Sequence, residues 1–172
     1  MTIVRTAEIS TEIFQITSKI TIPKWPPKSI TGTLYIREEN HFSQFISKCL
    51  ICDLKCLIFY FWEIQKISYD DFKVLTSSGR LEILDLGPTI VTSKNGEIIP
   101  YDSLLDHTPA LRYLRLEYNQ NLQLSQKFIE KICASNLEYF KIFELPENFE
   151  SEALLAYLAK GCNILYANVF YI

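Results

Sequence analysis

The sequence predicts an α/β fold with a parallel sheet on the concave side, helices on the convex side and about five to six irregular repeats. The main observation is a recurring template: an apolar residue, two residues of any kind, an apolar residue, one residue of any kind, and an apolar residue. Helical segments between the copies and the near-constant spacing of the copies support the same fold. The full copies begin at Leu54, Leu81, Leu111, Leu137 and Ile164.

The spacing of these copies indicates the type of repeat. A weaker copy begins at Thr31, so successive starts lie 23, 27, 30, 26 and 27 residues apart. This is close to the period of about 20–29 residues found in leucine-rich repeats. Chance is the alternative, because leucine is common and the template is loose. We therefore expect a leucine-rich-repeat-like solenoid, with strands near 54–60, 81–87, 111–117, 137–143 and 164–170 adjacent in chain order.

Helices are expected between the strands. Ser68 can cap the first turn of one helix, with Asp71 completing a capping box and Gly79 ending the helix. Ser125 and Ser151 can cap two later helices whose apolar residues cover one face. We interpret these apolar stripes as core.

Two further helices are expected, within 42–46 and 101–106. The first range carries apolar residues at helical spacing, while the second is long enough for only a short helix. Asn95 and Gly96 form a strong turn signal between apolar stretches. We expect a small hairpin or a bulged loop there.

Residues 1–29 do not fit the repeat and are predicted to form an N-terminal cap or connecting arm, which leaves 30–172 as the repeat domain. Prolines at positions 23, 26 and 27 interrupt regular structure before the first copy. A solenoid must shield the apolar end of its first repeat from water. The side chains available for this are Ile13, Phe14, Ile16 and Trp25. A remnant of a larger chain is the alternative.

Three segments carry a resemblance to a known family: Phe61 to Ile64, Ile67 to Arg80, and Asn95 to Pro100. Over roughly residues 45–160 the chain resembles nematode F-box-associated, leucine-rich-repeat-like proteins, and the matching motifs are structural. The resemblance implies that the repeats recruit a substrate and that an N-terminal F-box contacts a ubiquitin ligase. The F-box itself is not seen, because residues 1–29 lack its Leu-Pro opening and its spaced apolar helices.

Composition narrows the partners and the compartment. The net charge of −3 comes from interspersed signs without a basic block, so nucleic acid is not expected as a partner. Unbroken apolar runs, such as 57–62, are too short to cross a membrane. An odd number of cysteines (five), no Asn-x-Ser/Thr acceptor and no apolar block of signal-peptide length predict an intracellular protein, cytoplasmic or nuclear.

Catalytic and metal-binding patterns are weak. His41 and His107 have no spacing that pairs them with a carboxylate and a nucleophile, and there is no glycine-rich phosphate loop. We therefore predict that the protein is not an enzyme and needs no cofactor. Cys49, Cys52 and Cys56 could hold zinc or an iron–sulfur centre if a fourth ligand came from elsewhere. The favoured interpretation is that they are small buried hydrophobes, so no metal is predicted.

A binding surface follows from the alternation of side chains along each strand. Residues between the apolar template positions should point outward onto the concave face of the sheet, where they form three columns. The first column is Thr33, Cys56, Ile83, Tyr113, Tyr139 and Tyr166; the second is Tyr35, Ile58, Asp85, Arg115, Lys141 and Asn168; the third is Arg37, Tyr60, Gly87, Glu117, Phe143 and Phe170.

These columns are rich in tyrosine, which with arginine dominates the energetics of protein interfaces. The sequence therefore predicts a protein–protein interaction module with its protein partner on the concave face. The predicted binding residues are Tyr35, Tyr60, Tyr113, Arg115, Tyr139, Lys141, Phe143 and Tyr166. In the alternative, the tyrosines form a ladder that only stabilises the sheet, in a structural or degenerate family member without a specific ligand. The sequence indicates neither the identity of the partner nor the oligomeric state.

Overall fold

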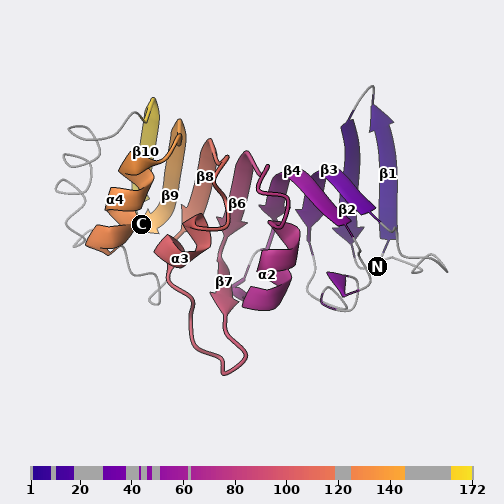
Figure 1. The fold of residues 1–172 in the computed structure, drawn as a ribbon, viewed down its shortest axis with the longest axis horizontal. Coiled ribbons are helices and arrows are strands. Elements are labelled where there is room, and N and C mark those ends of the chain that lie inside the picture. The colour runs from indigo at the N-terminus through magenta and orange to yellow at the C-terminus, as the bar shows by residue number, and fades with distance from the viewer. Residues whose placement is uncertain are drawn as a thin grey trace.

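The computed structural model describes residues 2–8, 11–17, 29–37, 43, 46–47, 51–61, 63–118, 125–145 and 164–171. Within them, eight strands form one sheet, in which β1 and β2 are antiparallel and all other neighbours are parallel (Figure 1). In spatial order these strands are β1 (Thr2–Glu8), β2 (Thr11–Thr17), β3 (Ser29–Ile36), β4 (Ile51–Phe59), β6 (Ile83–Gly87), β8 (Tyr113–Glu117), β9 (Tyr139–Leu145) and β10 (Tyr166–Tyr171). The fold is mixed α/β with a mostly parallel sheet.

The predicted order of strands is confirmed. The five full copies of the template supply β4, β6, β8, β9 and β10, which are neighbours in chain order and parallel. The weaker copy supplies β3, which pairs with β4. Strands β6, β8 and β9 each begin two residues after the first leucine of their copy, so this leucine precedes the regular ladder.

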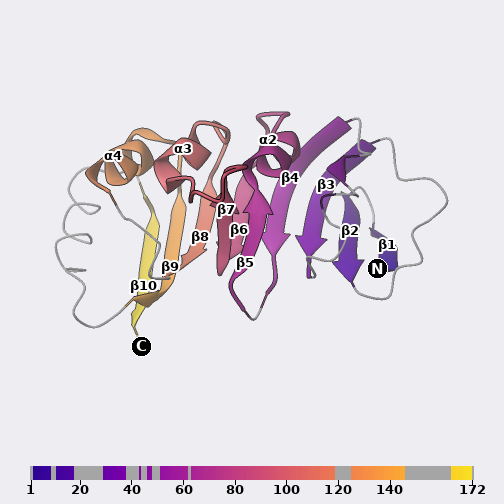
Figure 2. The ribbon, with the colours of Figure 1, turned by 90° about the horizontal axis from the view of Figure 1, so that it is seen from below.

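The described helices lie on one side of the large sheet (Figures 1 and 2). They are α2 (Tyr69–Leu75), α3 (Tyr101–Leu105) and α4 (Gln126–Ala134). A parallel pair of short strands, β5 (Gln65–Ser68) and β7 (Thr89–Thr92), contacts α2. None of the helices among the described residues is long and apolar enough to cross a membrane.

Two of the predicted helix caps are confirmed. The Ser68 hydroxyl accepts a hydrogen bond from the Asp71 backbone N–H at 3.0 Å, and the Ser125 hydroxyl accepts one from the Phe128 N–H at 3.1 Å. The short helix predicted over 101–106 is α3. The helix predicted after Ser151 lies outside the described residues, and of the range 42–46 only Ser43 and Ile46 are described, both with helical backbone.

Helix α2 ends earlier than predicted. Its C-cap is Thr76, whose N–H and hydroxyl both donate to the Phe72 carbonyl, at 3.0 and 2.9 Å. The following N–H groups bond to carbonyls three residues back, Ser77 to Val74 at 3.3 Å and Gly79 to Thr76 at 3.0 Å, so the α-helical pattern stops before Gly79. Gly79, with φ of +66°, instead lies in the turn that leads to the next strand.

The predicted hairpin after β7 is present. Gly96 has φ of +80°, a conformation that favours glycine, and the Ser93 N–H donates to the Glu97 carbonyl at 2.7 Å. An antiparallel bridge joins Thr92 to Ile98. This small loop projects from the body of the fold between β7 and α3 (Figure 1).

The core lies between the large sheet and the helices. The central template residues, such as Leu57, Leu84 and Leu114, are at most 1% exposed. Phe128 on α4 contacts Phe140 on β9 and Tyr101 on α3 edge-to-face, at ring-centroid distances of 6.2 and 6.1 Å. Phe128 therefore joins two helices to the sheet.

The segment predicted as a cap or arm supplies two strands to the large sheet. β1 and β2 form an antiparallel pair, and β2 runs parallel to β3 with Ile13 opposite Thr33. The side chains of Ile13, Phe14, Ile16 and Trp25, predicted to shield the first repeat, lie outside the described part of the structure.

We predict that Phe128→Ala lowers the free energy of unfolding by about 3–5 kcal/mol, because it leaves a cavity between α3, α4 and β9. Urea unfolding followed by circular dichroism measures the change. Glu130→Ala on the exposed side of α4 serves as the control and should change the free energy by less than about 0.5 kcal/mol. A loss below about 1 kcal/mol for Phe128→Ala would contradict this packing.

Candidate functional site

The sheet face that points away from α2, α3 and α4, here called the open face, carries the predicted columns. In the first column, Thr33, Cys56, Ile83, Tyr113, Tyr139 and Tyr166 occupy directly paired positions from β3 to β10. The second column, from Tyr35 to Asn168, is likewise paired residue by residue. The sequence therefore located two complete columns correctly.

The third column is interrupted at Gly87. Gly87 pairs with Leu116 rather than with Glu117, because the register shifts after Asp85. The Gly87 N–H donates to Asp85 Oδ1 at 3.0 Å, and its φ is +48°. A Cβ at this position would lie 3.3 Å from the Phe59 carbonyl oxygen, so close approach of the backbone also favours glycine.

Three tyrosines of the first column form a ladder over β8, β9 and β10. The rings of Tyr139 and Tyr166 are stacked with centroids 5.9 Å apart, and those of Tyr113 and Tyr139 are tilted with centroids 6.3 Å apart. Tyr139 is 38% exposed and Tyr166 is 61% exposed. The ladder therefore presents a large aromatic area to solvent.

Phe143 and Phe170 form a second aromatic stack, with centroids 4.4 Å apart and planes within 4°. Together with the tyrosine ladder they form what we call the aromatic patch: Tyr113, Tyr139, Tyr166, Phe143 and Phe170. Phe170 was placed in the third column but not among the predicted binding residues. Its position beside Phe143 in that column was the sequence feature that could have identified Phe170 as part of the binding surface.

Charged side chains lie between the two stacks. Arg115 pairs with Asp85 at 2.9 Å, and its guanidinium lies 4.6 Å from the centre of the Phe143 ring. The Lys141 ammonium lies 5.6 Å from the centre of the Tyr113 ring. A contiguous surface on β8, β9 and β10 therefore contains six of the predicted residues: Tyr113, Arg115, Tyr139, Lys141, Phe143 and Tyr166.

Tyr35 and Tyr60 are separate from this surface. Tyr35 lies on β3, and Tyr60 follows β4, where it is 49% exposed and lies 5.6 Å from the Arg37 guanidinium. Strand β6, with Ile83 and Asp85, lies between them and β8. The predicted binding residues thus form two groups.

Asp85 is the buried charge of the open face, at 8% exposure. Burial raises the pKa of its carboxyl above the ordinary value. The ion pair with Arg115 and the hydrogen bond from the Gly87 N–H lower this pKa, but they oppose the effect of burial only in part. Sequence reasoning placed Asp85 in a column but did not predict its pairing with Arg115, which is 30 residues away.

The described cysteines of the predicted cluster, Cys52 and Cys56, are buried, and Cys49 lies outside the described residues. In the part of the chain that the structure describes, no three Cys, His, Asp or Glu side chains are grouped as metal ligands would be. Burial raises the pKa of the Cys56 thiol to about 11. Cys133, outside this cluster, is disulfide-bonded.

The His107 ring contacts Tyr69. Its Nε2 is hydrogen-bonded to the Tyr69 hydroxyl at 2.6 Å, and the two rings meet edge-to-face. This bond joins the turn after α3 to the start of α2. His41 lies outside the described residues.

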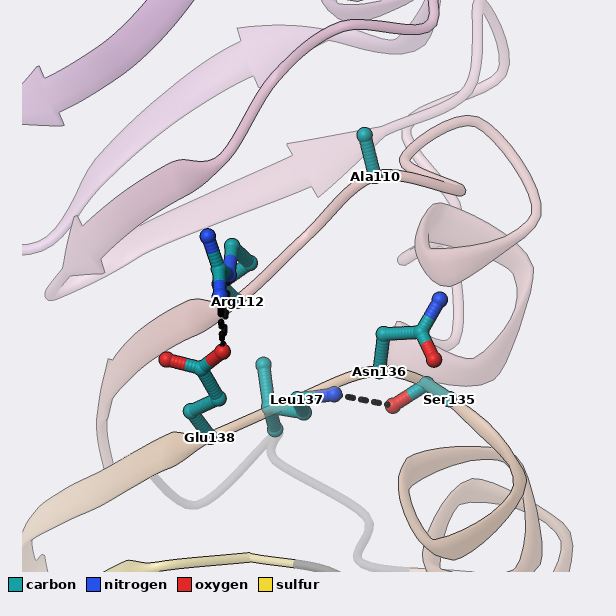
Figure 3. Close-up of a pocket in the computed structure, with 6 residues that line it drawn as sticks. All are labelled: Ala110, Arg112, Ser135, Asn136, Leu137 and Glu138. Carbon is teal, nitrogen blue, oxygen red and sulfur yellow. Dashed lines mark hydrogen bonds and ion pairs between the residues drawn. The ribbon is translucent and has the colours of Figure 1, made fainter.

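A pocket of about 440 Å³ lies beside the starts of β8 and β9 (Figure 3). Its lining residues are Ala110, Arg112, Ser135, Asn136, Leu137 and Glu138. Arg112 and Glu138 form an ion pair with each other, and the Ser135 hydroxyl accepts a hydrogen bond from the Leu137 N–H at 3.3 Å. The charged groups of the pocket are therefore already paired, and we assign no ligand to it.

No family model, curated relative or solved structure matches the chain.

We predict that Cys56 is a slow nucleophile. A rise in its pKa from 9.0 to about 11 lowers the thiolate fraction at pH 8 roughly hundredfold, and burial limits access further. Alkylation with iodoacetamide, followed by mass spectrometry of the Cys56 peptide, should therefore be at least about hundredfold slower in the folded chain than in urea. Similar rates in the two states would contradict this environment.

We predict that ionisation of the Asp85 carboxyl lowers the free energy of unfolding as pH rises. A carboxyl with a higher pKa in the folded than in the unfolded chain contributes stability below its ordinary pKa of 3.8, and this contribution is lost as pH rises through the folded value. Unfolding free energies of the wild type and Asp85→Asn should be compared between about pH 3 and pH 7. The wild type should lose stability relative to the variant over this range; a relative gain would show that Arg115 outweighs burial.

Proposed function

We propose that this chain is a leucine-rich-repeat-like solenoid whose open face binds a protein partner. The observation that carries the proposal is the aromatic patch on β8, β9 and β10, where Tyr139, Tyr166 and Phe170 are exposed while the alternate residues of β8 and β9 are buried beneath the helices. Strand order and the apolar template support the repeat. The described helices all lie on one side of the sheet, so none of them covers the open face.

The chemistry of the patch supports binding over a purely structural ladder. Tyr139 and Tyr166 keep 38% and 61% of their surface exposed, so their stacking alone leaves much apolar area in water. Arg115 and Lys141 lie among the rings and can pair with polar groups of a partner. A solvated sheet face without a ligand would instead favour Lys, Glu, Thr and Ser.

The family resemblance favours one form of this function, recruitment of a substrate to an F-box-type ubiquitin ligase. Residues 2–8 and 11–17 form strands rather than the helices of an F-box. Contact with a ligase would therefore need another segment or a separate adaptor. The alternative is a structural or degenerate family member without a specific ligand.

Affinity capture from a native extract would identify a partner, and purified proteins would then give the dissociation constant. We predict that Tyr139→Ala weakens binding by about 2 kcal/mol, roughly thirtyfold, because Tyr139 is the middle ring of the ladder. Calorimetric titration measures the affinity, and thermal melting checks that the variant is folded.

The control must remove apolar surface elsewhere. Ile64→Ala is suitable, because Ile64 is 54% exposed and follows β4, outside the patch. Lys127 on α4 is unsuitable, since it pairs at 3.0 Å with the buried carboxyl of Asp102. Equal weakening by Ile64→Ala and Tyr139→Ala, or weakening that follows the melting temperature alone, would favour the alternative without a ligand.

A further inference from the structure

Strand β10 is the last strand in the described order of the large sheet, and one of its sides is not paired there. The Tyr166 N–H donates to the Glu138 carbonyl at 3.1 Å, so the backbone groups of Tyr166 point toward β9. Because these groups alternate in direction along a strand, those of Ala167 and Val169 point away from β9. Among the described residues, no strand pairs with them on that side.

The side chains of this edge lack the usual protection against strand pairing. Natural edge strands commonly carry lysine, proline or inward-pointing charges. Residues 163–172 contain no charged residue, proline or glycine. Leu165, Tyr166 and Phe170 are 69%, 61% and 44% exposed, so apolar side chains accompany the available backbone groups.

We infer that β10 pairs antiparallel with β10 of a second copy of this chain, about a two-fold axis at Asn168. In this register Ala167 of one copy faces Val169 of the other, and their outward backbone groups form the hydrogen bonds. Asn168 faces Asn168 of the second copy across a pair without backbone hydrogen bonds. The two amides can bond to each other, and no like charges meet.

The same register places Tyr166 opposite Phe170 of the second copy, on the open face. The ladder Tyr113–Tyr139–Tyr166 then continues into the Phe170–Phe143 stack of the second copy, and the two-fold axis repeats this in the other direction. Facing residues of such pairs have Cα atoms about 4.5 Å apart, within reach of aromatic contact. This self-complementarity favours a second copy over an unrelated strand.

The inference goes beyond the proposed function and does not depend on it, because pairing uses the strand edge. Its consequence is a continuous sheet through both copies, with both aromatic patches on one face. A protein partner would then meet an aromatic surface of twice the length.

Sedimentation equilibrium of the full chain at increasing concentration tests the inference. The monomer mass is 20.0 kDa, and the wild type should approach twice that mass. Asn168→Lys and Asn168→Asp each place like charges on the two-fold axis and should each raise the dimer dissociation constant at least about tenfold. An equimolar mixture of the two variants should restore dimers, because opposite charges then face each other.

Ile64→Lys is the control, since it adds a positive charge at an exposed position outside β10 and should leave the dimer unchanged. Circular dichroism checks folding, and if one Asn168 variant fails to fold, the other is judged by the same tenfold criterion. A wild type that stays monomeric, a dimer that both variants leave unchanged, or folded variants whose mixture remains monomeric would each overturn the inference.

Discussion

The register between neighbouring strands depends on a backbone hydrogen-bond pattern that recurs where three successive strands begin. In each case the carbonyl just before one strand accepts hydrogen bonds from two consecutive N–H groups of the next segment, at 2.8–3.1 Å. The acceptors are Glu82, Arg112 and Glu138, and the donor pairs are Arg112 with Tyr113, Glu138 with Tyr139, and Leu165 with Tyr166; the shortest bond, from Glu138, is 2.8 Å. The Arg112–Glu138 ion pair joins two of these positions. A slip of one residue would break the pattern and reverse the faces of a strand.

Both faces of the sheet follow from this register. Leu84, Leu114 and Phe140 are buried under the helices, which fixes which alternate residues of their strands remain on the open face. Tyr113, Tyr139 and Tyr166 are then stacked because they are paired positions. The same register brings Arg115 beside Asp85, so the buried carboxyl is paired although burial still raises its pKa. Aromatic contact, charge pairing and exposure on this face are thus consequences of strand alignment.

Alternation along a strand can be counted in a sequence, and for this reason the first two columns could be predicted residue by residue. The break at Gly87 could not, because it depends on the carbonyl of Phe59 and the carboxyl of Asp85 in three dimensions. β5 and β7 are four residues each, so they are too short for periodicity to predict them. By contrast, β1 and β2 could have been predicted, because residues 2–17 are rich in β-branched side chains. Whether the aromatic patch binds a protein is not encoded in alternation at all.

The most direct test of the account is a nuclear Overhauser spectrum of the aromatic rings in the labelled full chain. The strand register predicts contacts between the rings of Tyr113 and Tyr139, and between those of Tyr139 and Tyr166, whose centroids lie 6.3 and 5.9 Å apart. It also predicts contact between Phe143 and Phe170. Contacts that instead join Tyr139 to the helix-side ring of Phe128 would place the tyrosines on the buried face and contradict the register on which the open face depends.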